Sequence, residues 1–202
     1  MAKKVLRASV MRKSEWFKER NQEEWKLIRE QVFKRDNETC VYCGWKARRF
    51  QQVNHIGAED NHNLDNLETV CAACHAVLHI GIKSMEGVLS AFDCKPELTN
   101  MARIVYATRV LVSRRTPWPE IERQVLEHYA LPGGRVYTCD ETVGLANQML
   151  KTIPPDEYRG YLPEGKAILF HASVPWKGFS ERVHLWQLPD GGKHSPVAKR
   201  FS

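Results

Sequence analysis

Four cysteines form two pairs with the spacing of metal-binding turns. Cys40 and Cys43 make the first CxxC pair, Cys71 and Cys74 make the second, and 27 residues separate the pairs. A CxxC turn directs both thiolates to one point, so two turns complete a tetrahedron around an ion. Such an ion stabilises a module of about 50 residues that is too small to build its own core. Four thiolates favour zinc, with an iron–sulfur cluster as the alternative.

Residues able to act on a phosphodiester are interleaved with these pairs. His55 and Asn66 lie between the pairs, His75 directly follows the second pair, and His79 comes four residues later. Positions i and i+4 share a helix face, so His75 and His79 can reach one ion. Residues in this order can hold Mg²⁺ or another divalent ion against a phosphodiester, and the ion would polarise the phosphate. The alternative is that these histidines cap or pack on the zinc module, while His62 is solvated.

The elements that must position these residues can be read from the apolar pattern. Residues 22–35 carry one apolar stripe at helical spacing and predict a helix before the first pair. Gly44 lies where the first turn needs a positive φ, and a short β-hairpin is expected to follow it. The second pair leads into a short helix. Residues 1–20 lack a sustained apolar period and are expected to form a mobile arm or a poorly anchored helix.

The second half predicts helices and strands without recognisable chemistry. A helix is expected over residues 96–115. A second is expected to start with Thr116 as its N-cap and Pro117 at its first helical position, and Asp140 is expected to cap a third. Residues 166–174 and 181–188 suit two strands of a hairpin, and the last dozen residues suit a flexible tail. Residues 82–92 are compatible with a strand or with a short helix.

Composition and charge narrow the classes of function. The chain of 202 residues has a net charge of +6, and residues 1–50 alone hold fourteen basic and seven acidic residues. This basic part could bind nucleic acid, an anionic lipid surface or an acidic partner, or it could be a solvated helix face. No apolar run is long enough to span a bilayer, and the first residues lack the apolar stretch of a secretory signal. A cytoplasmic location follows as an expectation, with reduced cysteines; Cys94 and Cys139 stand alone and suit a core.

The residues quoted above resemble the zinc-knuckle type of HNH endonuclease, whose fold is a ββα-metal unit. The resemblance implies that His55 is the general base and that Asn66 orients its ring. It also implies that Asn54 and His75 bind the catalytic ion, with His79 as a further ligand. Asn54 departs from the family pattern, which has Asp or His at this position, and a neutral amide is a weaker ligand than either.

A longer stretch, roughly residues 25–115, is similar to the IcmJ (DotN) family of HNH-like zinc subunits. The similarity includes "CVYCGWKARRFQQVN", Asn66-Leu67, the second CxxC pair and the "PELT" segment that starts at Pro96. Those proteins belong to the Dot/Icm type IVB secretion system and related conjugation machinery. The resemblance implies an adaptor that docks on the coupling-protein ATPase, in the cytoplasm or at the inner membrane through its partners. His55, His75 and His79 are residues that a pure scaffold does not need.

The sequence thus predicts an α+β protein. A basic arm over residues 1–20 precedes an HNH-like zinc module over 21–82. An extension follows over 83–115, then a C-terminal part over 116–202 with helices and a small α/β portion. The first hypothesis for function is a zinc-binding adaptor of a type IV secretion or conjugation coupling complex. The alternatives are a metal-dependent DNA endonuclease with His55 as base, and a metal-stabilised nucleic-acid-binding protein without catalysis.

Overall fold

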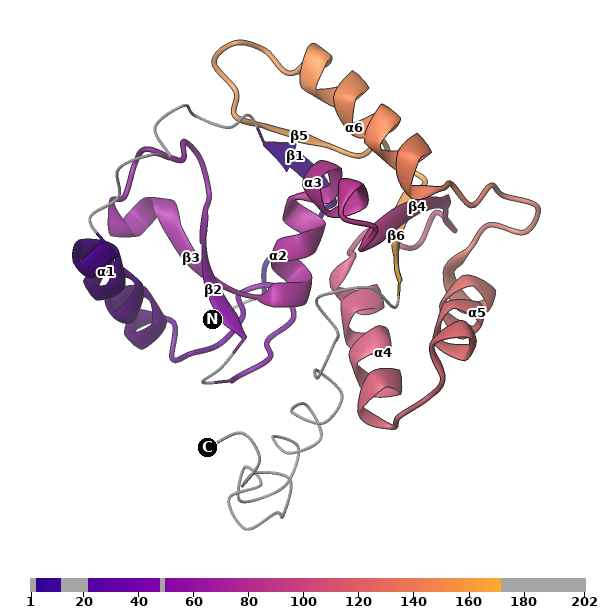
Figure 1. The fold of residues 1–202 in the computed structure, drawn as a ribbon, viewed down its shortest axis with the longest axis horizontal. Helices are drawn as coiled ribbons and strands as arrows, with labels where there is room; N and C mark the ends of the chain where they lie inside the picture. Colours follow the sequence, from indigo (N-terminus) through magenta and orange to yellow (C-terminus); the bar gives the residue numbers. More distant parts are fainter. Residues whose placement is uncertain (1–2, 12–21, 48–49, 172–202) are drawn as a thin grey trace.

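The structure, a computed structural model, describes residues 3–11, 22–47 and 50–171 and combines helices with short antiparallel strands (Figure 1). Within these ranges the strands form three two-stranded sheets, which pair β1 with β5, β2 with β3, and β4 with β6. The mixed architecture confirms the predicted α+β class. In chain order the elements are β1 (Ser9–Met11), α1 (Gln22–Arg35), β2 (Gln51–His55), the 3₁₀ turn η2 (Leu64–Asn66), β3 (Leu67–Cys71), α2 (Ala72–Leu78), α3 (Ile80–Met85), β4 (Leu89–Asp93), α4 (Ala102–Ser113), α5 (Trp118–Tyr129), α6 (Cys139–Thr152), β5 (Arg159–Tyr161) and β6 (Lys166–Phe170).

The ββα unit expected from the HNH resemblance is formed by β2, β3 and α2. The two strands pair from Gln51 opposite Cys71 to His55 opposite Leu67, and α2 begins directly after β3. Helix α1 has the bounds predicted from its apolar stripe and packs on the strand pair through a small core of Val32, Val53 and Leu67. The hairpin expected just after the first knuckle is replaced by this wider pairing, because residues 56–66 form a long loop between the strands.

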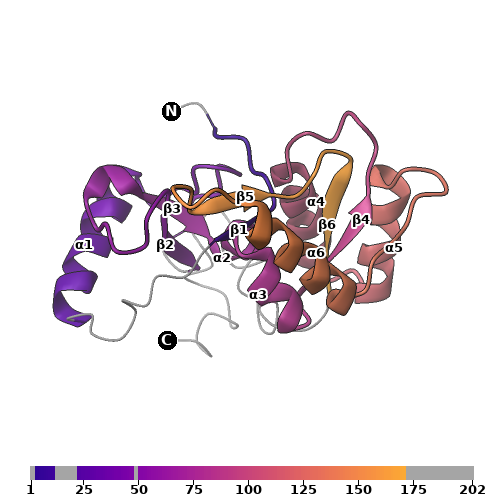
Figure 2. The same cartoon turned by 90° about the horizontal axis from the view of Figure 1, so that it is seen from above.

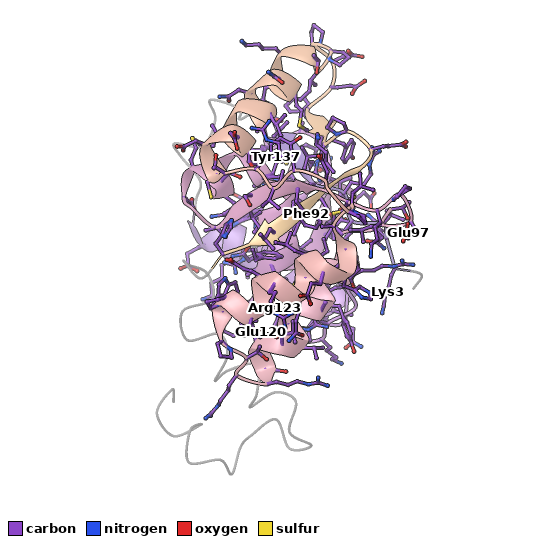
Figure 3. All side chains as sticks on the ribbon, turned by 90° about the vertical axis from the view of Figure 1, so that its right-hand side faces the viewer. Lys3, Phe92, Glu97, Glu120, Arg123 and Tyr137 are labelled. Carbon is purple, nitrogen blue, oxygen red and sulfur yellow. The ribbon has the colours of Figure 1, made fainter. Side chains whose placement is uncertain are left out.

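A second group of elements surrounds the β4–β6 pair. Phe92 of β4 is fully buried and lies between the strands and the helices α4, α5 and α6 (Figure 3). On the outward face of α5, Glu120 and Arg123 form an ion pair at 2.6 Å. The segment that the sequence left open between strand and helix contains both α3 and β4. This second group and the ββα unit lie next to each other in the elongated molecule (Figure 2).

Residues 3–11 join the two groups and do not form part of a mobile arm, whereas the rest of the predicted arm lies outside the described residues. Leu6, Ala8 and Val10 are at most 3% exposed and belong to the largest core. Strand β1 pairs antiparallel with β5, whose residues come almost 150 positions later. The backbone of Leu6 also bonds α4's first turn, since its carbonyl accepts from the Met101 N–H at 2.9 Å. Short apolar runs such as this one lack helical period and are stabilised only by partners distant in sequence.

Two predicted helix caps differ from the structure. Thr138, and not Asp140, caps α6. The Thr138 side chain accepts from the Glu141 N–H, and the Glu141 carboxylate accepts from the Thr138 N–H. This reciprocal capping box satisfies two backbone donors, which Asp140, already inside the first turn of the helix, cannot do. Helix α5 begins after Pro117, which itself occupies the cap position.

Of the two strands predicted for a C-terminal hairpin, only the first lies within the described residues. Residues 166–170 form β6 as expected, but their partner is β4, with Leu89 opposite Phe170 and Asp93 opposite Lys166. The second predicted strand, over 181–188, and the predicted tail lie outside the described residues. Among the described residues, none of the helices combines the length and the apolar character that crossing a bilayer requires.

Candidate metal centre

The first knuckle is a tight turn that brings two cysteines together. The Gly44 N–H donates to the Cys40 carbonyl at 2.9 Å, and the Cys40 N–H donates to the Trp45 carbonyl at 3.0 Å. Gly44 adopts φ +71°, as predicted, where a side chain is strained and where an added Cβ would also meet Lys3. The turn therefore holds Cys40 and Cys43 on one side of the loop.

The second knuckle is built by the start of a helix. Cys71 ends β3 and caps α2, where its sulfur accepts from the Cys74 N–H at 3.4 Å. One Sγ atom from each of the four cysteines lies within 4.8 Å of the others, and the Cys43 and Cys71 sulfurs are 3.7 Å apart. Metal–sulfur bonds of about 2.3 Å give a tetrahedron whose sulfur–sulfur edges are about 3.8 Å. The four sulfurs thus fit a tetrahedral metal site of the zinc type.

The electrostatics of this cluster also favour a cation at its centre. All four cysteines are buried. Hydrogen bonds from the neighbouring thiols lower the pKa of Cys43, whereas burial raises the pKa of Cys74. Without a cation, a buried cluster cannot hold four negative charges. Bound Zn²⁺ would hold all four as thiolates and so join β3, α2 and the first knuckle.

His75 and His79 form a second group of potential ligands, as the sequence suggested. Their rings meet edge to face with centroids 4.6 Å apart, and their Nε2 atoms are 3.1 Å apart. His75 Nδ1 donates to Gln52 Oε1 at 2.5 Å, which leaves its Nε2 lone pair directed at His79. Burial, followed by the charge of His79, lowers the pKa of His75 to about 3. His75 is therefore neutral at physiological pH, as a metal ligand must be.

Asn54 lies on β2, and its amide is hydrogen-bonded to a buried carboxylate. Asn54 is opposite Glu68 in the β2–β3 register, and its Nδ2 donates to Glu68 Oε1 at 2.8 Å. Glu68 also accepts from the Tyr42 hydroxyl at 2.6 Å and pairs with the Lys4 ammonium at 2.9 Å. Asn54 Oδ1 is buried and has no hydrogen-bond partner among the described residues. Glu68 was not among the predicted site residues, because only the strand register brings it to Asn54.

His55 lies under helix α1. The residue is only 7% exposed. Its ring stacks on the Trp25 ring, with centroids 5.6 Å apart and an angle of 4° between the planes. His62, which the sequence suggested was solvated, is half-buried and packs against both rings. The candidate base is thus enclosed by aromatic side chains.

Asn66, the candidate orienting residue, binds the loop after β2. Its Oδ1 accepts from the Gly57 N–H at 2.8 Å, and its Nδ2 donates to the carbonyls of Ala58 and Asn61. These three bonds close the loop over residues 57–61. The amide hydrogen bonds of Asn66 therefore fix the backbone that follows His55.

Arg159 reaches this region from the C-terminal part, to which the sequence assigned no chemistry. The residue is 9% exposed, and its Nη2 donates to the His55 carbonyl at 2.7 Å. Its Nη2 also lies 3.0 Å from the Met11 sulfur, and Met11 lines a small cavity together with His79. No carboxylate pairs with Arg159 among the described residues. A buried positive charge therefore lies beside the strand that presents Asn54 and His55.

We predict that Asn54→Asp will make the protein depend on a bound cation. The new carboxylate would face Glu68, and such like charges raise the pKa of a carboxyl group. Losing a hydrogen bond to a charged group and adding this repulsion should cost about 2–3 kcal/mol at neutral pH. Stability should return as the pH falls through the raised pKa, or when Mn²⁺ is added. Thermal unfolding with and without Mn²⁺ measures both effects.

Asn54→Ala is the matched control, because it removes the same hydrogen bond without adding charge. Its stability should respond neither to Mn²⁺ nor to mild acid in the way of Asn54→Asp. An Asn54→Asp variant that, with its zinc in place and no Mn²⁺ added, is as stable as the wild type would contradict the prediction.

The two cysteine pairs lie in the part of the chain that matches a known protein family. Residues 40–79 match the family model described as HNH endonuclease. Over 81 residues the chain is 37% identical to the type 4 apparatus protein DotN of Legionella pneumophila, which covers 38% of this chain and 37% of DotN. Over 75 residues it is 35% identical to a probable HNH endonuclease of Lactococcus phage SK1, which covers 33% of this chain and 77% of the phage protein. The match thus spans little more than a third of DotN and most of the phage protein.

Proposed function

Because the chain belongs to the HNH endonuclease family, and because it is 37% identical to DotN over 81 residues, we propose that it is an HNH-fold adaptor. In this proposal the zinc-stabilised module is a structural component of a type IV secretion or conjugation coupling complex. Its partner is the coupling-protein ATPase, and it does not cut DNA. The chemistry of the four-cysteine site suits this role, since a closed tetrahedral centre stabilises a fold and leaves no position open for substrate.

The enclosure of His55 is the observation that carries the proposal. A general base must come within about 3 Å of the proton that it removes, directly or through one water. His55 is instead stacked on Trp25 and flanked by His62, beneath α1. A scissile phosphate could approach this imidazole only after α1 moved away from the strand pair. An adaptor needs no such movement.

The charges around the candidate ion site support the same proposal. The Asn54 amide donates to Glu68, whose charge is already balanced by Lys4. The Arg159 guanidinium adds a positive charge at the His55 carbonyl, and it disfavours a second cation nearby. Asn54 contributes only a neutral oxygen, which holds a hard cation less firmly than a carboxylate does.

The test is incubation of metal-defined protein with supercoiled plasmid in Mg²⁺ and in Mn²⁺. We expect no nicking beyond that of His55→Ala prepared in parallel, because the base is enclosed. In a second arm, the full chain should be retained by the purified coupling-protein ATPase encoded near it. Nicking by the wild type that His55→Ala abolishes would overturn the adaptor proposal.

One observation favours the alternative, a metal-dependent nuclease. The Nε2 atoms of His75 and His79 converge to 3.1 Å, as two ligands of one ion would. Such an ion would polarise the scissile phosphate and stabilise the leaving oxygen. If the chain is a nuclease, His75→Ala should abolish the Mn²⁺-dependent nicking, and His55→Ala should reduce it about 10²–10⁴-fold. Both variants should keep the four-cysteine metal ion.

A further inference from the structure

Helix α4 sends a buried guanidinium to the four-cysteine centre. Arg109 is 7% exposed, although arginine is one of the residues that proteins bury least. Its Nη1 donates to the sulfur of Cys43 at 3.5 Å, across 66 positions of sequence. This bond links a helix outside the ββα unit to one of the four candidate ligands.

Two aromatic rings hold the guanidinium in place. Its Cζ lies 5.1 Å from the ring centre of Trp45 in the first knuckle and 5.4 Å from that of Tyr106 on α4. Trp45 itself stacks with Phe50. Aromatic faces attract a cation and at the same time exclude water from it. The orientation of Arg109 toward Cys43 is therefore built into the contact between α4 and the knuckle.

The charge of Arg109 has no carboxylate partner among the described residues. Burying a cation without a counter-charge costs several kcal/mol, so buried cations are normally paired. The acceptor that it reaches is the sulfur of Cys43 in the four-cysteine cluster. A divalent ion held by four thiolates carries a double negative charge, and Arg109 would neutralise half of it. A cluster of neutral thiols would leave the guanidinium uncompensated.

We propose that Arg109 is the outer-sphere counter-charge of the four-cysteine metal centre and that it couples metal binding to the position of α4. Donation to a metal-bound sulfur stabilises the thiolate and reduces its reactivity, so the centre releases its ion more slowly. In return, the loaded centre neutralises Arg109 and holds α4 against the knuckle. This inference goes beyond the adaptor proposal and applies equally to a nuclease.

The test uses the full chain loaded with zinc, with Arg109→Leu, Arg109→Lys and the control Arg103→Leu. Arg103 lies on the exposed side of the same helix. Loss of an outer-sphere partner typically weakens a metal site about 10–100-fold. We expect zinc transfer to a chromogenic chelator to be faster by about this factor in Arg109→Leu. Arg109→Lys should fall between, because an ammonium keeps the charge but not the planar stacking. Arg103→Leu should match the wild type.

Two further readouts separate this role from simple packing. Alkylation followed by mass spectrometry should show Cys43 labelled faster than Cys40, Cys71 and Cys74 in Arg109→Leu. Unfolding should show that Arg109→Leu destabilises the zinc-loaded protein but leaves the chelator-treated protein unchanged or more stable. Equal destabilisation of both states, or unchanged zinc transfer and labelling, would overturn the proposal. If the chelator-treated protein does not fold, the rate of zinc transfer and the labelling of Cys43 are the two measurements that test the role of Arg109.

Discussion

Cys71→Ser is expected to release the metal ion and to unfold the ββα unit. The Cys71 sulfur is one of the four clustered sulfurs and also caps α2, and serine can replace the cap but not the thiolate ligand. Structural zinc contributes about 10–16 kcal/mol of apparent binding free energy in small zinc domains. Whole domains are stable by only about 5–15 kcal/mol. Losing a large share of the binding energy should therefore remove most of the stability.

Elemental analysis and denaturant unfolding measure the two consequences of Cys71→Ser. We expect one zinc per wild-type chain, none in Cys71→Ser, and the same loss in Cys43→Ser. Cys94→Ser is the matched control, because Cys94 is also buried but lies outside the cluster. It should keep the zinc and unfold cooperatively. Stoichiometric zinc in Cys71→Ser, or none in a wild type purified without chelator, would contradict the metal assignment.

Leu6→Ala should destabilise the whole protein by about 2–5 kcal/mol, the usual cost of truncating a large core side chain. Leu6 is 0% exposed and lies in the largest core, and its backbone bonds to Asn100 and Met101 hold the chain beside α4. The truncation would leave a cavity inside the core, and the surrounding side chains would close it only partly. The measurement is the midpoint of thermal or denaturant unfolding with zinc present.

The adjacent residue offers a sharp control for that prediction. Val5 is 59% exposed, so Val5→Ala should change the stability by no more than about 0.5 kcal/mol. Equal effects of the two substitutions would mean that the segment over residues 3–11 does not pack as the structure has it. A large effect of Leu6→Ala alone identifies this segment as part of the core.

The parts of the fold that sequence predicted well are those with local causes. The helical stripe over residues 22–35, the positive φ of Gly44 and the convergence of the cysteines each follow from residues close together in the chain. The capping box of α6 was also local, since Thr138 and Glu141 have the required spacing. Asp140 was chosen instead because aspartate is a common cap, although it lies inside the first turn.

The parts that sequence missed depend on contacts between distant residues. Glu68, Arg109 and Arg159 look like ordinary surface charges in the sequence, and only the strand register and the packing of α4 and β5 bury them. The N-terminal segment was mistaken for an arm because it is short and basic. Leu6, Ala8 and Val10 alternate with exposed or polar residues, and this period of two was the available signal for a strand.

The pairing of β1 with β5 has a consequence for how the protein is made. Met11 lies opposite Arg159, so β1 leaves the ribosome well before its partner strand β5 is translated. The two knuckles are complete at Cys74, when more than half of the chain is still unsynthesised. Because domains begin to fold during synthesis, metal capture should be an early event and closure of β1 a late one. During that interval the apolar side chains of Leu6, Ala8 and Val10 lack the β5 partner that helps to bury them in the folded protein.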